Sequence, residues 1–316
     1  MAYINSGENE IFYERRGSGP PLLLINGFGP PCEWIEQFYL PHFLPHFDCV
    51  WFDLRGVGRS SELQDRSSYQ LGDHANDVAA VLDAVGWDTA HIWGASFGAA
   101  LALQVACDLP ERVRSIAIAA ADPGTPDIFQ KSYADVYDAR RAYFGSLARQ
   151  VETPVEATDE MMKAYFPEEQ RRTDPRANDV RNALIKMLSE RPIKDLMSPF
   201  KDIAEMTMAA AELPEAAVPS GSGGTGAVWS QLDALKSVNT PVLLLQGYSD
   251  LLVHRDAAFY LTNELPNIEL RLIKPAAHSF AISDEHLEGM ARWILRREDN
   301  LHSVSGVELR TASSHR

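Results

Sequence analysis

Five short apolar runs recur along the chain, each of strand length, and they constrain the fold more than any other feature. None of them alternates apolar and polar residues, so neither face of such a strand could be left to solvent. Strands that are apolar on both faces belong to a sheet that helices cover on both sides. The runs span Pro20–Asn26, Asp48–Arg55, His91–Ala95, Val113–Ala121 and Pro241–Gly247.

The segments between these runs show helical periodicity. Residues 72–86 place Val78, Val81, Leu82 and Val85 on one helical stripe, and a glycine follows that can end the helix. A succession of strand, helix and strand predicts parallel strands that are joined by right-handed crossovers.

The opening residues 3–17, YINSGENEIFYERRG, depart from this rhythm and predict an antiparallel hairpin on the sheet edge. The predicted fold class is therefore α/β: a mostly parallel, twisted sheet flanked by helices, with an inserted helical cap.

The cap is predicted because the strand rhythm stops between about residues 124 and 238. That segment is amphipathic and helical in pattern, with starts such as TDPRANDV and SPFKDIAEM, where a capping residue precedes a proline. We expect a core of residues 1–123 and 239–298, a helical cap of residues 124–238, and a flexible polar tail of residues 299–316.

Six of the eight methionines lie in the predicted cap. They either fill gaps between cap helices or line a pocket for a bulky apolar ligand, since the thioether side chain is flexible. The candidate substrate contacts are Met161, Met206 and Trp229 in the cap and Gly27 in the core.

The composition narrows the range of partners. Acidic residues outnumber basic ones 44 to 29, which gives a formal net charge of −15. Such a surface repels phosphate backbones and anionic lipids, so neither nucleic acid nor membrane is an expected partner. A small molecule is expected instead, and a homodimer is left open.

The expected location is cytoplasmic. Cys32, Cys49 and Cys107 are too few and too scattered for a disulfide framework or a metal site. The first residues lack the pattern of a secretory signal, and no apolar run is long enough to span a bilayer.

The stretch HIWGASFGAALALQ places Ser96 between a strand and a helix that follows without a gap. So tight a turn forces the residue at its apex into a strained conformation, and the small residues Gly94 and Gly98 relieve the crowding around it. Glycine and serine are also ordinary turn residues, but an ordinary turn does not explain the immediate helix. Ser96 is therefore the candidate nucleophile.

A serine hydroxyl needs a base to remove its proton and an acid to orient that base. Asp250 follows the run that ends at Gly247, and His278 lies in the loop after the next expected strand, IELRLI. Asp122 also follows a strand and competes with Asp250 for the role of acid. The other histidines are expected at the surface or in packing, and Asp53 in a structural turn.

An oxyanion formed by attack on a carbonyl needs hydrogen-bond donors. The glycine-rich loop INGFGPPCEW follows the first parallel strand and lets backbone N–H groups approach a ligand. The N–H groups of Phe28 and Phe97 are the expected donors.

Taken together, these motifs resemble the α/β-hydrolase superfamily, particularly small esterase and lactonase-like members with a helical cap. The resemblance is carried by NGFG, DLRGVGRS, GDHANDVAAVLDAVGWDTAHIWGASFG, LPERVRSIAIA, TPVLLLQGYSD and AAHSF. It implies Ser96 as nucleophile, Asp250 as acid and His278 as base, Phe28 and Phe97 as oxyanion donors, and no metal or organic cofactor.

Two positions depart from the family pattern. Asn26 stands where a histidine usually precedes the oxyanion-loop glycine, and we expect its amide to support the loop instead. Ala95 stands before the nucleophile, where many members carry a larger polar residue. The cap segment matches no known pattern, so the substrate stays open.

The leading functional hypothesis is a serine hydrolase that cleaves a carboxylic ester or lactone of a small, largely apolar molecule through an acyl-enzyme. Carbon–carbon bond hydrolysis or a lyase reaction could use the same residues. An aminopeptidase is less favoured, because the cap offers no obvious acidic cluster for an α-amine, although Glu205 and Glu212 leave it open. A hydrolase-like receptor that closes on a ligand is the alternative outside enzymes.

Overall fold

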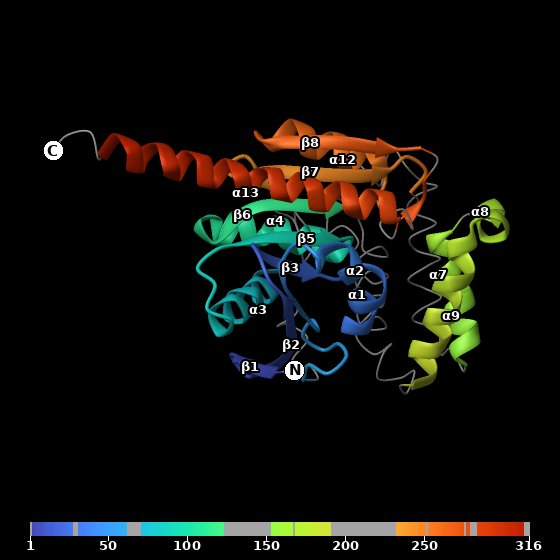
Figure 1. Ribbon diagram of the computed structural model, residues 1–316. Coiled ribbons are helices and arrows are strands. Elements are labelled where there is room, and N and C mark those ends of the chain that lie inside the picture. Colours follow the sequence, from blue (N-terminus) through green and yellow to red (C-terminus); the bar gives the residue numbers. More distant parts are fainter. Residues whose placement is uncertain are drawn as a thin grey trace, which may run out of the picture.

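One eight-stranded sheet organises the chain (Figure 1). The computed structural model describes residues 2–27, 31–61, 71–122, 153–166, 168–190, 232–250, 252–274, 276–278 and 283–312. The strand order is β1-β2-β4-β3-β5-β6-β7-β8. The strands are β1 Ala2–Ser6, β2 Asn9–Gly17, β3 Pro21–Ile25, β4 Asp48–Phe52, β5 Ala90–Ala95, β6 Val113–Ala119, β7 Val242–Gly247 and β8 Ile268–Ile273.

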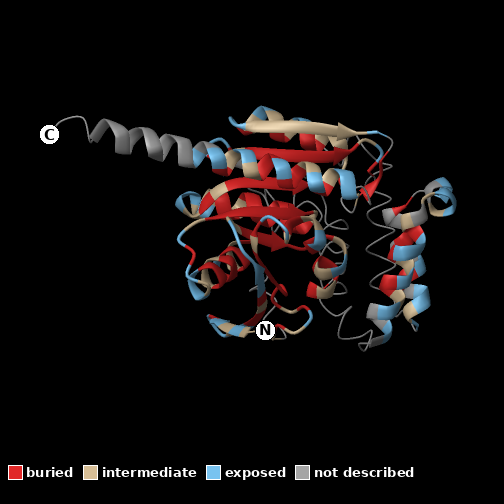
Figure 2. Cartoon of the chain, viewed as in Figure 1, coloured by how far each residue is buried: buried red, intermediate tan, exposed pale blue. Residues whose placement is uncertain are grey.

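Strand direction follows the sequence prediction. β1 and β2 form an antiparallel hairpin, β2 pairs antiparallel with β4, and every pair from β4 to β8 is parallel. The α/β class and the edge hairpin are thereby confirmed. The strands at the centre of the sheet are buried on both faces, as Figure 2 shows in red.

Helices cover both faces of the sheet, and the sheet separates the buried core into two clusters. One cluster packs α1 (Cys32–Phe38), α2 (Leu40–Phe43) and α13 (Asp284–Ala312) against the sheet. The other contains α3 (Leu71–Ala84), α4 (Phe97–Asp108) and residues of α12 (Arg255–Glu264). A short 3₁₀ turn, Pro110–Arg112, leads from α4 to β6.

The described part of the inserted segment is helical: α7 Pro154–Tyr165, α8 Glu168–Thr173, α9 Pro175–Glu190 and α11 Leu232–Leu235. Helix α9 starts where TDPRANDV predicts, with the Asp174 carboxylate accepting the N–H of Arg176 (3.0 Å). Leu235 of α11 is buried in the same cluster as α4. The chain has therefore rejoined the core by α11, before the expected boundary at 238. The second predicted start, SPFKDIAEM, lies outside the described residues.

The tail departs from its expected secondary structure. Helix α13 continues through Ala312, whereas residues 299–316 were expected to be irregular. The polar composition of this stretch does not indicate a helix. The helix can still continue here, because its packed first half has already nucleated it.

A buried hydrogen-bond chain fastens α13 to the sheet. His91 Nδ1 lies 2.8 Å from Ser115 Oγ, and His91 Nε2 lies 2.9 Å from Glu298 Oε2. Burial lowers the pKa of His91 to about 4. His91 and Ser115 are completely buried near the amino ends of β5 and β6, whereas Ser96 follows the carboxyl end of β5, so we interpret this serine–histidine–carboxylate chain as structural. In the described residues, no helix is both long and apolar enough to cross a membrane.

Candidate active site

Ser96 lies at a sharp turn between β5 and α4. Its backbone has φ 54° and ψ −116°, which few non-glycine residues adopt, and it is the N-cap of α4. Its N–H donates to the carbonyl of Ala119 at the end of β6 (2.8 Å). The strained apex that the sequence predicts is thus present, and Ser96 is partly exposed there.

The two flanking glycines are required by close backbone approach. A Cβ at Gly94 would lie 2.6 Å from the carbonyl carbon of Gly98. A Cβ at Gly98 would lie 2.8 Å from the carbonyl carbon of Ile25 in β3. Both distances are well inside van der Waals contact, so α4 can approach β3 and β5 this closely only without side chains at these positions.

Replacing Gly98 with alanine is expected to destabilise the protein by about 1–3 kcal/mol, because α4 must move away from β3. Gly289→Ala in α13 is the matched control, since a Cβ there meets nothing within 4 Å. We expect that variant to be neutral or slightly stabilising. Chemical denaturation of both variants measures the difference, and equal stabilities would contradict the proposed crowding.

Asp250 and His278 form a buried, hydrogen-bonded pair. His278 Nδ1 lies 2.8 Å from Asp250 Oδ2. The other oxygen of Asp250 accepts the N–H groups of Leu252 (2.8 Å) and Val253 (2.9 Å). Asp250 is 1 % exposed and His278 5 %. The carboxylate is therefore held in one orientation, and it fixes which ring nitrogen of His278 carries a proton.

The sheet topology places the three predicted residues at one end of the parallel strands, the edge formed by their carboxyl ends. Ser96, Asp250 and His278 follow the carboxyl ends of β5, β7 and β8, which belong to one parallel set of strands. In open α/β sheets, ligands bind at this edge. Asp122, the competing acid, follows β6 at the same edge and is also buried.

Gln246, which sequence reasoning missed, supports the Asp250 loop. Its side-chain amide donates to the carbonyls of Val253 (2.8 Å) and Gly247 (3.2 Å), and it is completely buried. A polar residue inside an otherwise apolar strand was the available signal.

Asn26 hydrogen-bonds to both ends of the glycine-rich loop after β3, the expected oxyanion loop. Its side-chain oxygen accepts the N–H of Gly27 (2.9 Å), and its amide donates to the carbonyl of Pro31 (3.2 Å). A Cβ at Gly27 would lie 3.5 Å from Ser96 Cβ, so Gly27 borders the candidate nucleophile. Phe97 is buried at the first position of α4. Phe28 lies outside the described residues.

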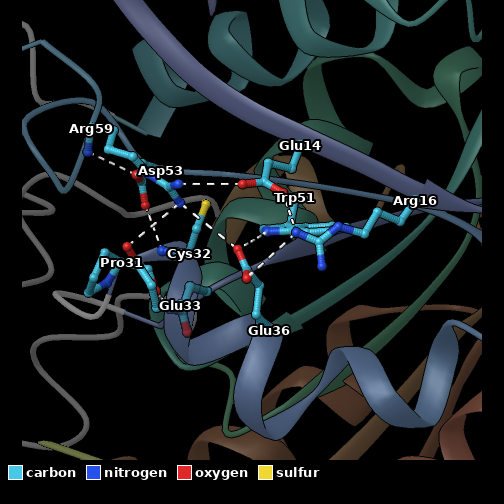
Figure 3. Close-up of polar contacts among 10 residues, drawn as sticks. Glu14, Arg16, Pro31, Cys32, Glu33, Glu36, Trp51, Asp53 and Arg59 are labelled. Atoms are coloured by element: carbon cyan, nitrogen blue, oxygen red, sulfur yellow. Dashed lines mark hydrogen bonds and ion pairs between the residues drawn. The ribbon is translucent and has the colours of Figure 1, made fainter. Parts of the chain in front are cut away.

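Asp53 occupies the structural turn that the sequence predicts (Figure 3). Its carboxylate accepts the N–H groups of Cys32 (2.6 Å) and Arg59 (2.8 Å) and is completely buried. Burial raises the pKa of Asp53, and the two backbone hydrogen bonds oppose that rise. The pair of contacts ties the start of α1 to the turn after β4, beside the oxyanion loop.

One further histidine, His74, and the three proposed substrate contacts of the cap remain to be placed. His74 is buried in packing against the Phe97 ring (5.1 Å between centroids), and burial, followed by the nearby Arg55 charge, lowers its pKa well below the usual value. Met161 lies on α7, but its side chain is outside the described residues. Met206 and Trp229 lie outside the described residues altogether.

A family model for the alpha/beta hydrolase fold matches residues 20–285. The chain therefore belongs to the alpha/beta hydrolase fold family.

Several hydrolases are among its relatives. A putative carbamate hydrolase of Azorhizobium caulinodans is 34% identical over 37% of this chain and 43% of its own length. The zearalenone hydrolase of Cladophialophora bantiana is 31% identical over 50% of this chain and 58% of its own length. The chain thus matches about half the length of these curated relatives.

Solved structures show the same fold over almost the whole chain. An alpha/beta hydrolase from a deep-sea metagenome library has a TM-score of 0.70 at 18% identity, with 93% of this chain and 97% of that chain covered. Est816, described as an N-acyl homoserine lactone degrading enzyme, has a TM-score of 0.66 at 22% identity, with 92% of this chain and 99% of that chain covered.

Proposed function

We propose that the protein is a serine hydrolase that cleaves a carboxylic ester or lactone of a small, largely apolar molecule. The observation that carries the proposal is the buried Asp250–His278 hydrogen bond at the sheet edge where the Ser96 turn lies. An oriented imidazole and a strained, partly exposed serine are the two components that acyl transfer requires.

In the proposed mechanism, His278 accepts the proton of Ser96 as the serine oxygen attacks the carbonyl carbon of the substrate. Asp250 stabilises the imidazolium that forms. The N–H groups of Phe28 and Phe97 are proposed to bind the oxyanion. His278 then protonates the leaving alcohol, and a water activated by the same residue releases the acid from the acyl-enzyme.

The proposed substrate class draws on the relatives and on the inserted helices. A zearalenone hydrolase and an N-acyl homoserine lactone degrading enzyme are among the similar proteins. Met162 of α7, Phe166 directly after it and Leu184 of α9 are apolar and are buried in the same cluster as residues of the sheet. Met161, Met206, Trp229 and Gly27 are proposed to contact the substrate, in keeping with a ligand that is mostly apolar.

The proposal is tested by labelling with a fluorophosphonate, followed by mass spectrometry of the peptides. We expect one adduct, on Ser96, and loss of ester turnover in proportion to labelling. A panel of p-nitrophenyl esters, lactones and β-diketones then identifies the bond that is cleaved. An adduct elsewhere, or full turnover after complete labelling of Ser96, would contradict the mechanism.

We also propose a cytoplasmic location. Cys32, Cys49 and Cys107 are all free thiols, which suits a reducing compartment. Alkylation of the thiols in freshly lysed cells tests this: we expect all three reduced.

A further inference from the structure

Strand β8 is the last strand on one side of the sheet, and among the described residues it pairs only with β7. All six of its residues, IELRLI, are partly exposed. Edge strands of monomers are commonly protected by proline, charged side chains, a bulge or a covering element. β8 contains no proline and its register with β7 is regular, and its two charged residues are of opposite sign, so a second copy can pair with them instead of being repelled.

The backbone of β8 presents a defined set of groups to this edge. The carbonyls of Asn267 and Ile273 accept hydrogen bonds from Val242 and Tyr248 at the two ends of the β7 pairing. Because ladder bonds recur at every second residue, residues 267, 269, 271 and 273 face β7. The N–H and C=O groups of Ile268, Leu270 and Leu272 therefore point away from the sheet.

The two charged side chains of β8 lie on the face that α13 covers. Trp293 Nε1 of α13 donates to Glu269 Oε2 (2.9 Å), and Arg271 Nη2 lies 2.6 Å from Glu269 Oε1. Both remain accessible, since the side chains of Arg271 and Glu269 are 40% and 43% exposed. A negative and a positive group thus stand two residues apart along this edge strand.

We propose that a second copy of this chain pairs antiparallel with β8 about a two-fold axis through Leu270, giving a homodimer with one continuous sheet. In this register Leu270 of each copy exchanges both backbone hydrogen bonds with the other, and Ile268 pairs with the partner's Leu272. Glu269 then lies opposite the partner's Arg271 in a non-hydrogen-bonded pair, where cross-strand side chains are closest. Symmetry creates this contact twice.

Charge selects this register from its neighbours. An axis through Glu269 would oppose two glutamates, and an axis through Arg271 would oppose two arginines. Axes through Ile268 or Leu272 give neither charge an opposite partner. The other edge of the sheet, β1, has no charged residue with which to specify a register. Each copy carries a net charge of −15, so association needs such a local attraction.

Charge exchange tests the dimer, and it does so independently of the proposed hydrolytic activity. Pairing of one six-residue strand buries less than the roughly 1,600 Å² of a standard interface, so we expect a dissociation constant in the micromolar range. By sedimentation velocity, Glu269→Arg and Arg271→Glu should each raise that constant at least about tenfold, because two attractive contacts become repulsive. The double variant Glu269→Arg/Arg271→Glu should restore it.

Glu288→Arg on α13 is the matched control. It makes the same change in net charge as Glu269→Arg and disrupts an exposed ion pair with Arg292 (3.4 Å) within α13. We expect its dissociation constant to match that of the wild type, and circular dichroism verifies that each variant is folded. A monomeric wild type across the micromolar range, an unchanged constant in both single variants, or failure of the double variant to restore dimers would each overturn the proposal.

Discussion

Replacing Ser96 with alanine is expected to lower the turnover of a short p-nitrophenyl ester by about 10⁴–10⁶-fold. Alanine fits the same backbone position but leaves no oxygen to attack the carbonyl. The substrate can still bind, so KM should change far less than kcat. Steady-state kinetics measures kcat and KM. Fluorophosphonate labelling of the variant sample shows whether traces of another serine hydrolase contribute to the turnover.

Ser115→Ala is the control for this experiment. Ser115 also belongs to a serine–histidine–carboxylate chain, with His91 and Glu298, yet that chain is buried at the opposite end of β5 and β6. We expect the alanine to reduce stability, while the kcat of the folded protein stays within a few-fold of the wild type. Residual turnover in Ser96→Ala close to that of Ser115→Ala would contradict the assignment of the nucleophile.

Replacing Asp250 with asparagine is expected to reduce kcat by about 10⁴-fold. An amide of similar size occupies the same space, but it cannot stabilise an imidazolium and favours the wrong tautomer of His278. The N–H groups of Leu252 and Val253 can still bond to the amide oxygen, so the loop should keep its conformation. Ester turnover and far-UV circular dichroism together separate loss of chemistry from loss of fold.

Asp122→Asn is the matched variant, because Asp122 follows β6 at the same edge and competed for the role of acid. We expect its kcat to remain within about tenfold of the wild type, since the hydrogen bond from His278 goes to Asp250. If the Asp122 variant proved as inactive as the Asp250 variant, the two carboxylates would have to share the role.

Much of the fold could be predicted because the central strands of the sheet are buried on both faces. Uninterrupted apolar runs reveal such strands, and the intervening periodicity reveals helices such as α3. The turn at Ser96 could be predicted because a helix follows the strand without a gap, and the structure shows that the glycines at 94 and 98 permit the close backbone approach there. The order of strands then led to Asp250 and His278, because parallel strands end at one edge.

Other features depend on contacts between distant residues that a local pattern does not contain. Nothing near His91 in the sequence indicates that it forms a hydrogen bond with Glu298, which lies more than two hundred residues away along the chain. Gln246 looks like an irregularity in a strand until its contacts with the Asp250 loop are known. The tail after residue 299 has the composition of coil, yet it continues a helix whose first half is packed on the sheet.

The backbone angles at Ser96 imply that this residue costs the folded protein stability, a cost that its proposed role as nucleophile would explain. A conformation of this kind costs a non-glycine residue about 1–3 kcal/mol, whereas glycine adopts it freely. Ser96→Gly should therefore melt at a higher temperature than Ser96→Ala, although both lack the hydroxyl. The variant with the higher melting temperature would then be one that lacks the proposed nucleophile.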